Sequence, residues 1–443
     1  MSPFAIALKS VKNRALVTGL TALSVALGTM LVVAVLSTAA VVDKSLSKPA
    51  TPFDLILGPK GSDLQLVLTT LYRMPAPMEP LPYPYYQQLQ EHPRVAEAVP
   101  IAFGDTTQEG GFPIVATIGR FFKAGLNRNE PFRFAPGSGS RGFGGESGFE
   151  AIIGSEVARL NQWDVGDSFK LVHGGADDPN AHVHDELFEI VGVLSPTGTA
   201  NDRTAFVQLN GFYAVAGHDK PLEEGVNRWR ALRGLPELEG EALKQAVREA
   251  NVPGVGGTPD LQKEVSAIFV DVKGDREANM GVILFASEIN EGFQAAAVNP
   301  AGPVSRLRET FLAPAQAVLV ALSVLVVIVA GVGIFVSLYT TLSDRMTEVA
   351  VLRALGAQRT TVFAVVLLEA LVVTFLGGVA GFFLGHALTF AVLPFLPAGL
   401  VIDPWAVRWE ELLLIPGLAL LAAFAGLLPA TRAYGADVAK YLN

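Results

Sequence analysis

The hydrophobic and polar positions of this 443-residue chain divide it into membrane-like and water-soluble parts. Four stretches carry no charged residue or almost none, over lengths that can cross the ~30 Å hydrocarbon core of a bilayer as a helix. They are Leu16–Val42, Ala313–Leu342, Thr360–Leu393 and Leu412–Ala430. Residues 43–312 have the mixed composition of a globular domain. The pattern predicts one transmembrane helix, a large external domain and three further transmembrane helices.

The first apolar stretch follows a basic segment, as the core of a signal peptide does. Its uncharged run greatly exceeds the about 7–15 residues of a signal-peptide core, so we interpret it as a retained membrane anchor. If wholly helical, the first and second stretches reach about 40 and 45 Å at ~1.5 Å per residue. Either the excess length projects outward as a stalk beneath the external domain, or the helices are tilted.

Basic residues, which are concentrated in cytoplasmic segments, indicate the orientation of the four stretches. They are Lys9, Lys12 and Arg14 before the first stretch, Arg345, Arg353 and Arg359 between the second and third, and Arg432 and Lys440 after the fourth. The loop at 394–411 instead holds Asp403, Glu410 and Glu411 against Arg408 alone. We therefore expect both termini in the cytoplasm, and this loop and the large domain outside.

The third stretch has glycine at every fourth position, at Gly377, Gly381 and Gly385. Small residues at this spacing let transmembrane helices approach closely, so this face is predicted to pack against another helix, of this chain or of a second copy. Glu369 and His386 are ionisable residues in the same stretch. Because both lie within about two turns of a helix end, we expect their side chains to extend to the membrane surface rather than to form a proton path.

The external segment contains alternating and β-branched runs that predict an α/β unit in two parts. The first part has strands at 53–57, 95–103 and 113–118 and helices at 62–72 and 83–91; the second has strands at 265–272 and 293–298 around a helix at 276–290. Between them, the Gly/Ser-rich stretch Gly137–Gly145 has linker composition. It precedes a predicted β-rich insertion with strands at 151–154, 168–172, 187–194 and 204–209.

Composition and missing motifs exclude several classes of function. The chain has no Cys, which excludes disulfides, thiolate metal sites and cysteine nucleophiles. Its net charge of −9 argues against a nucleic-acid partner, because phosphate binding needs a basic surface. The sequence contains no G-x-x-x-x-G-K-[ST] loop. We therefore expect no enzymatic activity from this chain and no bound cofactor.

One histidine-rich segment offers candidate metal ligands. In a strand, His182, His184 and Glu186 would share one face and present imidazole and carboxylate groups to a divalent ion. His173 lies nearby in the sequence, and His218 is a fourth ligand only if the fold brings it close. The alternative is a solvated polar loop, which is the interpretation that the sequence favours, so no metal site is predicted.

The cytoplasmic segment between the second and third stretches, Arg345–Ala357, carries a specific motif. It resembles the signature R-x-x-E-[IV]-x-x-L-R-[AS]-[LI]-G-A at every defined position. This signature is typical of the membrane subunits of ABC transporters in the MacB/LolC/FtsX superfamily, also called type VII. Glu369 and Pro429–Ala433 also match the usual pattern, although Asp437 is followed here by Val438 where the family has proline.

The resemblance extends to the external domain. Ile153–Ala158 and Val165–Ser168 are similar to the start of the inserted Sabre subdomain of MacB-type permeases, and the flanking α/β unit resembles their porter subdomain. The implied fold is an α-helical membrane protein with four transmembrane helices and a large α+β periplasmic domain. Its implied divisions are the N-terminus with the first transmembrane helix (1–48), the porter-like unit (49–136 and 262–308), the linker with the Sabre-like insertion (137–261) and the FtsX-like membrane domain (309–443) with a coupling helix at 343–357.

The resemblance also implies a function for the signature segment. In the family it is the coupling helix that docks on an ABC ATPase subunit, which uses ATP and Mg²⁺. The residues implied in coupling are Arg345, Glu348, Val349, Leu352, Arg353, Ala354, Leu355 and Gly356. Arg345 and Glu348 can pair at i, i+3, and Gly356 suits a helix end that needs a positive φ.

The chain is thus expected to be a multi-pass subunit of the bacterial inner membrane, paired with a second copy or a paralogous permease. It would transmit motion mechanically from a separate ATPase to the periplasm, with a periplasmic adaptor or cargo protein as a further partner, besides membrane lipids. The cargo class would be amphipathic, such as a lipoprotein, peptide, siderophore or drug. Two alternatives stay open: an FtsX-like regulator of a periplasmic cell-wall hydrolase, and a permease tied to metal-ion traffic.

Overall fold

The computed structural model describes the chain except for residues 1, 48–50, 75–77, 146–147, 174–180, 255, 275–279, 345, 355, 393–404 and 435–443, and except for the side chains at 41–47, 341, 344, 348, 352 and 433. The chain forms two compact units. The first unit comprises Met1–Asp43, Glu309–Leu396 and Ile402–Asn443, and the second comprises Lys44–Arg308 and Pro397–Val401.

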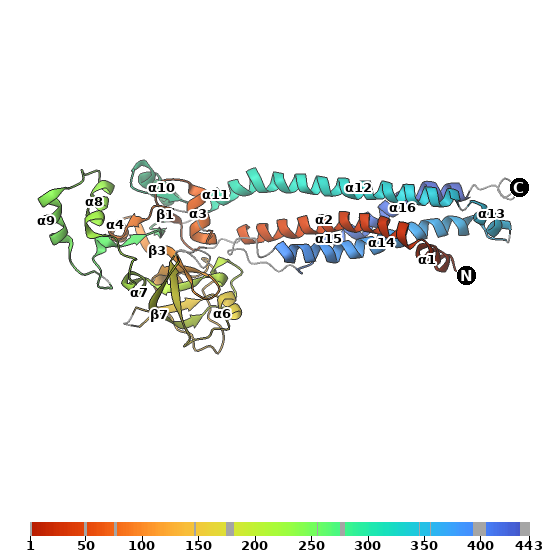
Figure 1. Cartoon of the computed structure of the whole chain (residues 1–443). Helices are drawn as coiled ribbons and strands as arrows, with labels where there is room; N and C mark the ends of the chain where they lie inside the picture. Colours follow the sequence, from red (N-terminus) through yellow and green to blue (C-terminus); the bar gives the residue numbers. More distant parts are fainter. Residues whose placement is uncertain are drawn as a thin grey trace. The chain divides into compact units, whose positions relative to one another are not determined.

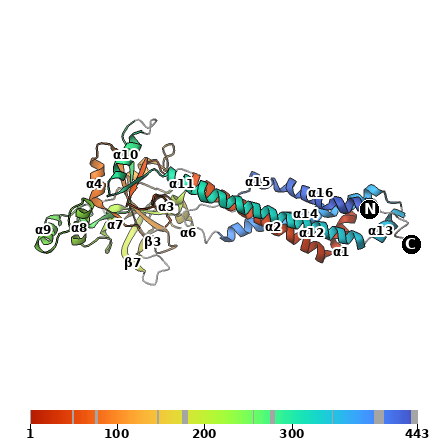
Figure 2. The ribbon, with the colours of Figure 1, turned by 90° about the horizontal axis from the view of Figure 1, so that it is seen from above.

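The first unit is built from long apolar helices, of which α2, α12, α14 and α16 run side by side (Figures 1 and 2). Its elements are α1 (Pro3–Asn13), α2 (Ala15–Ser47), the π-helical turn η3 (Arg308–Leu312), α12 (Ala313–Asp344), α13 (Met346–Ala354), α14 (Arg359–Val392), α15 (Trp409–Leu412) and α16 (Leu414–Tyr434). The helices meet in a core of small and branched residues, which lets their axes approach closely. This core consists of Val25, Ala330, Ile334, Leu338, Ala370, Ala422 and Ala425.

Among the described residues, four helical segments are long and apolar enough to cross a membrane: Ala15–Ala40, Ala301–Thr340, Arg359–Val392 and Trp409–Arg432. The four predicted transmembrane helices are therefore confirmed. The second segment begins at Ala301 rather than Ala313, because α11 (Ala301–Leu307), η3 and α12 follow one another without a break. Arg306, Arg308 and Glu309 precede the uncharged stretch of sequence, but charged residues do not by themselves end a helix.

The second unit contains a nine-stranded sheet with the order β11-β1-β10-β3-β4-β8-β5-β7-β6. Its strands are β1 (Leu55–Gly58), β3 (Val95–Thr107), β4 (Pro113–Thr117), β5 (Glu150–Ile153), β6 (Ser168–His173), β7 (His182–Val193), β8 (Ala205–Gln208), β10 (Ala267–Val272) and β11 (Ala296–Val298), and β2 (Leu81–Pro82) pairs separately with β9 (Glu264–Val265). Nine helices accompany the strands in the described part of this unit: α3 (Asp63–Tyr72), α4 (Tyr83–Glu91), α5 (Arg120–Ala124), α6 (Ser155–Asn161), α7 (Leu209–Ala214), α8 (Leu222–Leu232), α9 (Gly240–Ala250), α10 (Met280–Glu291) and α11, with short 3₁₀ turns η1 (Ala200–Arg203) and η2 (Asp260–Gln262).

Strand β3 joins the porter-like strands to those of the expected insertion. Its first half, from Val95 to Ile101, pairs with β10, whereas Asp105–Thr107 pair with β6. Strand β4 likewise pairs with β8, which belongs to the insertion. All nine strands therefore lie in one hydrogen-bonded sheet. The segment 137–261 also contributes the helices α6–α9 besides its strands, which the sequence pattern did not predict.

The Gly/Ser-rich stretch 137–145 is fastened to the sheet and is not a free linker. The Arg141 N–H donates to Val191 O over 2.8 Å, and the Val193 N–H donates to the Ser140 hydroxyl over 3.0 Å. The Arg141 guanidinium also pairs with the buried Glu150 carboxylate of β5. Composition alone indicates backbone freedom, whereas hydrogen bonds to β7 and the ion pair with Glu150 hold this stretch in place.

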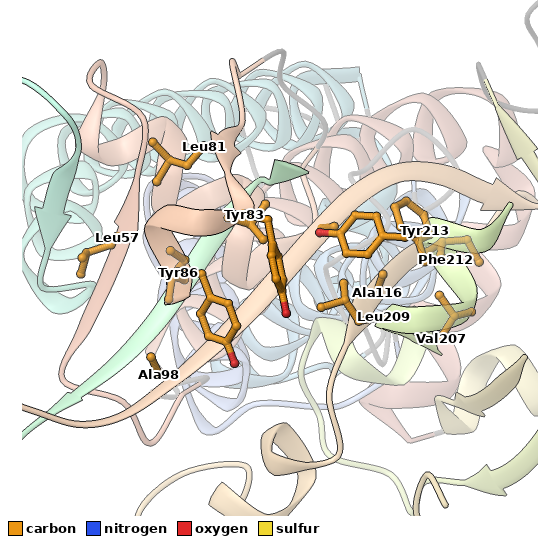
Figure 3. Packing of buried hydrophobic residues seen from close by; sticks show 14 of the residues in the cluster. Leu57, Leu81, Tyr83, Tyr86, Ala98, Ala116, Val207, Leu209, Phe212 and Tyr213 are labelled. Atoms are coloured by element: carbon orange, nitrogen blue, oxygen red, sulfur yellow. The ribbon is translucent and has the colours of Figure 1, made fainter. Parts of the chain in front are cut away.

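Aromatic residues of α4 and α7 pack on the sheet and form much of its core. Tyr83 of α4 lies between Tyr86 of the same helix and Tyr213 of α7 (Figure 3). The ring centroid of Tyr83 is 5.3 Å from that of Tyr86 and 5.9 Å from that of Tyr213. The Tyr213 hydroxyl donates to Glu264 O over 2.5 Å, so its buried polar end is satisfied. This packing fixes α7, and with it the loop that follows and carries His218.

Candidate functional site

The predicted coupling segment forms a short helix, α13, between α12 and α14. Val349 and Ala350 are buried, whereas Val351 is 43% exposed. Val349 belongs to a hydrophobic cluster with residues of three long helices: Leu342 of α12, Val362 and Val366 of α14, and Ala430 of α16. One side of α13 is thus packed on the ends of the membrane helices. The same helix also exposes one apolar side chain, that of Val351.

The end of α13 has the geometry that the sequence suggests. Ala354 is its last residue, and Gly356 has a φ of +97°, a conformation that glycine adopts at no steric cost. The Gly356 N–H donates to Arg353 O over 3.0 Å. Arg345 and Leu355 lie outside the described residues, as do the side chains of Glu348 and Leu352, so the Arg345–Glu348 pair stays a prediction.

The glycine stripe of α14 lies against α2 of the same chain. A Cβ at Gly377 would be 2.6 Å from Ala22 O, one at Gly381 would be 2.4 Å from Ala26 O, and one at Gly385 would be 2.6 Å from Val33 Cβ. Such distances leave no room for any side chain. Of the two partners that the sequence left open, a helix of this chain is the one that this face contacts.

Glu369, His386 and Glu411 of the membrane unit are buried rather than extended to its surface. Glu369 of α14 is 8% exposed and accepts a 2.9 Å hydrogen bond from the Ser10 hydroxyl of α1. The His386 Nε2 lies 3.2 Å from a carboxylate oxygen of Glu411, whose other oxygen accepts from the Ser37 hydroxyl over 3.2 Å. The surface placement expected for Glu369 and His386 was wrong because polar partners on α1, α2 and α15 satisfy them internally.

In the external unit, four side chains far apart in sequence converge on one point. His173 ends β6, His184 lies on β7, His218 lies in the loop after α7 and Asp105 lies on β3. The Asp105 carboxylate is 2.9 Å from His173 Nδ1, 2.9 Å from His218 Nε2 and 3.6 Å from His184 Nε2. One ligand atom from each residue lies within 4.8 Å of the others. Carboxylate and imidazole donors in this number are those that Zn²⁺ takes.

The charge states of the carboxylate and the imidazoles in this cluster follow from their burial and from their distance to one another. Burial raises the pKa of Asp105, but the adjacent His218 and His173 rings outweigh this and hold its pKa below the ordinary value. Burial lowers the pKa of His184, which favours its neutral form. For His218, burial lowers the pKa but the Asp105 carboxylate outweighs it, and the net shift is upward. The cluster therefore presents an anionic carboxylate and a neutral imidazole.

The two other sequence candidates lie beside this cluster. His182 and Glu186 lie on β7 together with His184. The segment is therefore a strand, and the polar loop that the sequence favoured is not found. The rings of His182 and His184 are 5.2 Å apart, but neither His182 nor Glu186 belongs to the group of converging ligand atoms. Asp105 was missed because the predicted strand ended at Phe103, whereas β3 continues to Thr107.

Two family models match the chain. The model described as MacB-like periplasmic core domain matches residues 18–279, and the model described as FtsX-like permease C-terminal matches residues 320–437. No curated protein matches. Of 29 matching solved chains, the periplasmic region of MacB from Actinobacillus actinomycetemcomitans is 7% identical with a TM-score of 0.31, covering 59% of this chain and 95% of its own. The extracellular domain of the noncanonic ABC-type transporter YknZ from Gram-positive bacteria is 11% identical with a TM-score of 0.28, covering 56% and 99%.

The MacB-like model alone spans more than half of the chain, and the FtsX-like model covers most of the remaining membrane helices. The chain therefore belongs to the MacB/FtsX-type permeases of ABC transporters. It is a membrane protein with a periplasmic domain, in a family whose members are generally non-catalytic subunits that work with an ABC ATPase.

Proposed function

We propose that this permease converts ATP hydrolysis on a separate ATPase polypeptide into movement of its periplasmic domain, as part of a dimer in the bacterial inner membrane. The ATPase binds the ATP and Mg²⁺, and this chain binds neither. The moving domain exports or extracts an amphipathic cargo, such as a lipoprotein, peptide, siderophore or drug. A periplasmic adaptor is a further partner in this proposal.

The packing of α13 is the observation that supports coupling. Val349 contacts side chains at the ends of α12, α14 and α16. A force applied to α13 by a docked ATPase therefore acts on three membrane helices together. Close-packed interfaces move as units because their side chains interdigitate without free space. The exposed Val351 offers the partner an apolar contact on the face of α13 away from these helices.

Val351→Glu tests this proposal in the full-length chain, co-expressed with its ATPase. Placing a charge at the centre of a contact costs roughly 2 kcal/mol or more, so recovery of the ATPase with the permease and the hydrolysis rate of the complex should fall more than about tenfold. Glu348→Lys, which reverses a signature charge, should act in the same direction. The purified permease alone should show no ATP turnover.

Val407→Glu is the matched control, because Val407 is also an exposed valine, at 57%, and lies in the loop predicted outside the membrane. This variant should retain the ATPase and its activity. If Val351→Glu binds and supports the ATPase as the parent does, α13 is only a connector and the coupling proposal fails. Turnover by a permease preparation free of any ATPase would contradict the non-catalytic part of the proposal.

A further inference from the structure

Three buried polar atoms lie at the centre of the external cluster, and none of them has a hydrogen-bond partner within the described part of the chain: Asp105 Oδ2, His184 Nε2 and His218 Nε2. The side chains of these residues are 1%, 4% and 5% exposed. An unsatisfied buried polar group costs about 1–3 kcal/mol, so three facing one another need a common partner. All three atoms are buried, so bulk water does not reach them.

The second ring nitrogen of His218 shows which form of the ring faces the cluster. Nδ1 lies 2.7 Å from the carbonyl oxygen of Phe212, which only accepts, so Nδ1 carries a proton and donates. When a metal ion displaces the proton from Nε2, this nitrogen directs its lone pair into the space that it shares with Asp105 Oδ2, 2.9 Å away. A histidine that donates one N–H to a backbone carbonyl and directs its other nitrogen inward has the arrangement typical of metal ligands.

A proton on His218 Nε2 would satisfy Asp105 Oδ2 through a hydrogen bond. It would still leave the buried Nε2 of His184, 3.6 Å from the same oxygen, without a partner among the described residues. A single cation between the three atoms satisfies all of them. Ligand atoms of a tetrahedral Zn²⁺ site lie about 3.4 Å apart when the bonds are about 2.0–2.1 Å long. The distances from the Asp105 oxygens, 2.9 and 3.6 Å, lie on either side of this value, and all four ligand atoms are within 4.8 Å of one another.

We propose that the periplasmic domain binds one Zn²⁺ ion through four side chains: Asp105, His173, His184 and His218. His173 completes the set, since its Nδ1 is 2.9 Å from Asp105 Oδ1. Its side chain is 63% exposed, so the ion enters and leaves on that side while the other three ligands stay fixed. The site joins β3, β6 and β7 to the loop after α7. Metal binding therefore stabilises the domain at the end of the sheet where these strands meet.

The experiment uses the full-length permease in detergent, carrying an affinity tag without histidines and freed of metal by a chelator. Zn²⁺ binding is measured by competition with a chromophoric chelator, and Co²⁺ is added separately as a spectroscopic probe. The parent should bind one Zn²⁺ per chain and give the visible absorption of four-coordinate Co²⁺. Loss of a residue that only hydrogen-bonds to a metal ligand weakens metal affinity about 10–100-fold. His184→Ala removes a ligand itself, so it should weaken Zn²⁺ binding at least about 100-fold.

Two further variants separate ligand loss from misfolding. His173→Ala changes an exposed side chain, so the variant should fold as the parent does while Zn²⁺ binding weakens about tenfold or more and the Co²⁺ spectrum changes. His182→Ala removes the neighbouring ring of β7 that is not in the cluster, and it should bind Zn²⁺ as the parent does. The proposal is overturned if the parent binds no Zn²⁺ at micromolar concentration, or if His173→Ala and His184→Ala bind as tightly as His182→Ala.

Discussion

His386 and Glu411 form a fully buried polar pair inside the membrane unit, with Nε2 of the histidine 3.2 Å from Oε2 of the glutamate. His386 lies on α14 and Glu411 on α15, so the pair ties the start of the last transmembrane segment to the third. The sequence pattern placed Glu411 in the loop that is expected outside the membrane. In the structure Ser37 of α2 also donates to it, so three segments of chain share this carboxylate.

Removing the imidazole should destabilise the helical unit. His386→Ala leaves the Glu411 carboxylate buried, with the Ser37 hydroxyl as its remaining side-chain donor among the described residues, and breaking a buried pair costs about 3–5 kcal/mol. The expected result is a clearly lower thermal unfolding midpoint of the purified permease. His386→Gln, which keeps an N–H donor, should lose less. His182→Ala is the control, because His182 is an exposed histidine of β7 and surface substitutions usually change stability by less than about 0.5 kcal/mol. Equal midpoints for His386→Ala and His182→Ala would show that the buried pair contributes nothing.

The membrane part of the fold could be predicted from sequence because hydropathy records burial in lipid directly. All four segments were found, and the glycine spacing identified the face of α14 that packs closely. Sequence did not say which helix would fill that face. The partner helix is determined by three-dimensional fit, here against the carbonyl oxygens of Ala22 and Ala26 on α2. No local sequence pattern in α2 indicates that it is the partner.

The glycine contacts predict a strong effect of side-chain size. Gly381→Val would place a Cβ 2.4 Å from Ala26 O and 2.6 Å from Thr29 Cβ, so α2 and α14 must separate. Overpacking of this kind costs about 1–3 kcal/mol or more, and we expect a lower unfolding midpoint and less protein in the membrane. Gly333→Val on α12 is the matched control, since nothing lies within 4 Å of the added Cβ. Similar yields and midpoints for the two variants would contradict the close packing of α14 on α2.

The external site was only partly predictable, for a different reason. The histidine-rich segment does form a strand, β7, but a strand face alone does not select a ligand set. The choice depends on Asp105 and His218, which reach the site through the pairing of β3 with β6 and through α7. Sheet order is a non-local property, and the sequence offered no signal for either residue beyond its chemistry.

Orientation can be tested cleanly because the chain has no cysteine. The structure favours Lys244 of α9 as the external labelling position, since its side chain is 68% exposed, whereas the Ser140 hydroxyl accepts a hydrogen bond from Val193 N–H. A membrane-impermeant thiol reagent should label Lys244→Cys in intact cells and should label the exposed Ser343→Cys only after the cells are opened. Labelling of Ser343→Cys in intact cells would reverse the predicted topology.

The Glu150 carboxylate predicts a local dependence on pH. Burial raises its pKa, but the N–H groups of Gly145 and Gly144 and the Arg141 guanidinium outweigh this and hold the pKa below its ordinary value of 4.5. A lowered folded-state pKa stabilises the fold above pH 4.5, and this stabilisation is lost as the pH falls below 4.5 toward the folded-state pKa. Residues 137–145 should therefore exchange amide hydrogens faster, after correction for intrinsic rates, as the solution is acidified.

Glu150→Gln should remove that dependence. Hydrogen bonds to a charged group are worth about 1.5–3 kcal/mol, so at pH 7 the variant should exchange residues 137–145 more than about tenfold faster than the parent, and acid should change its rate little. The control is Glu156→Gln, which breaks a more exposed i, i+3 pair with Arg159 and should leave this segment protected because surface pairs contribute little. If the parent and Glu150→Gln exchange this segment equally at pH 7, the carboxylate does not hold the glycine-rich stretch against the sheet.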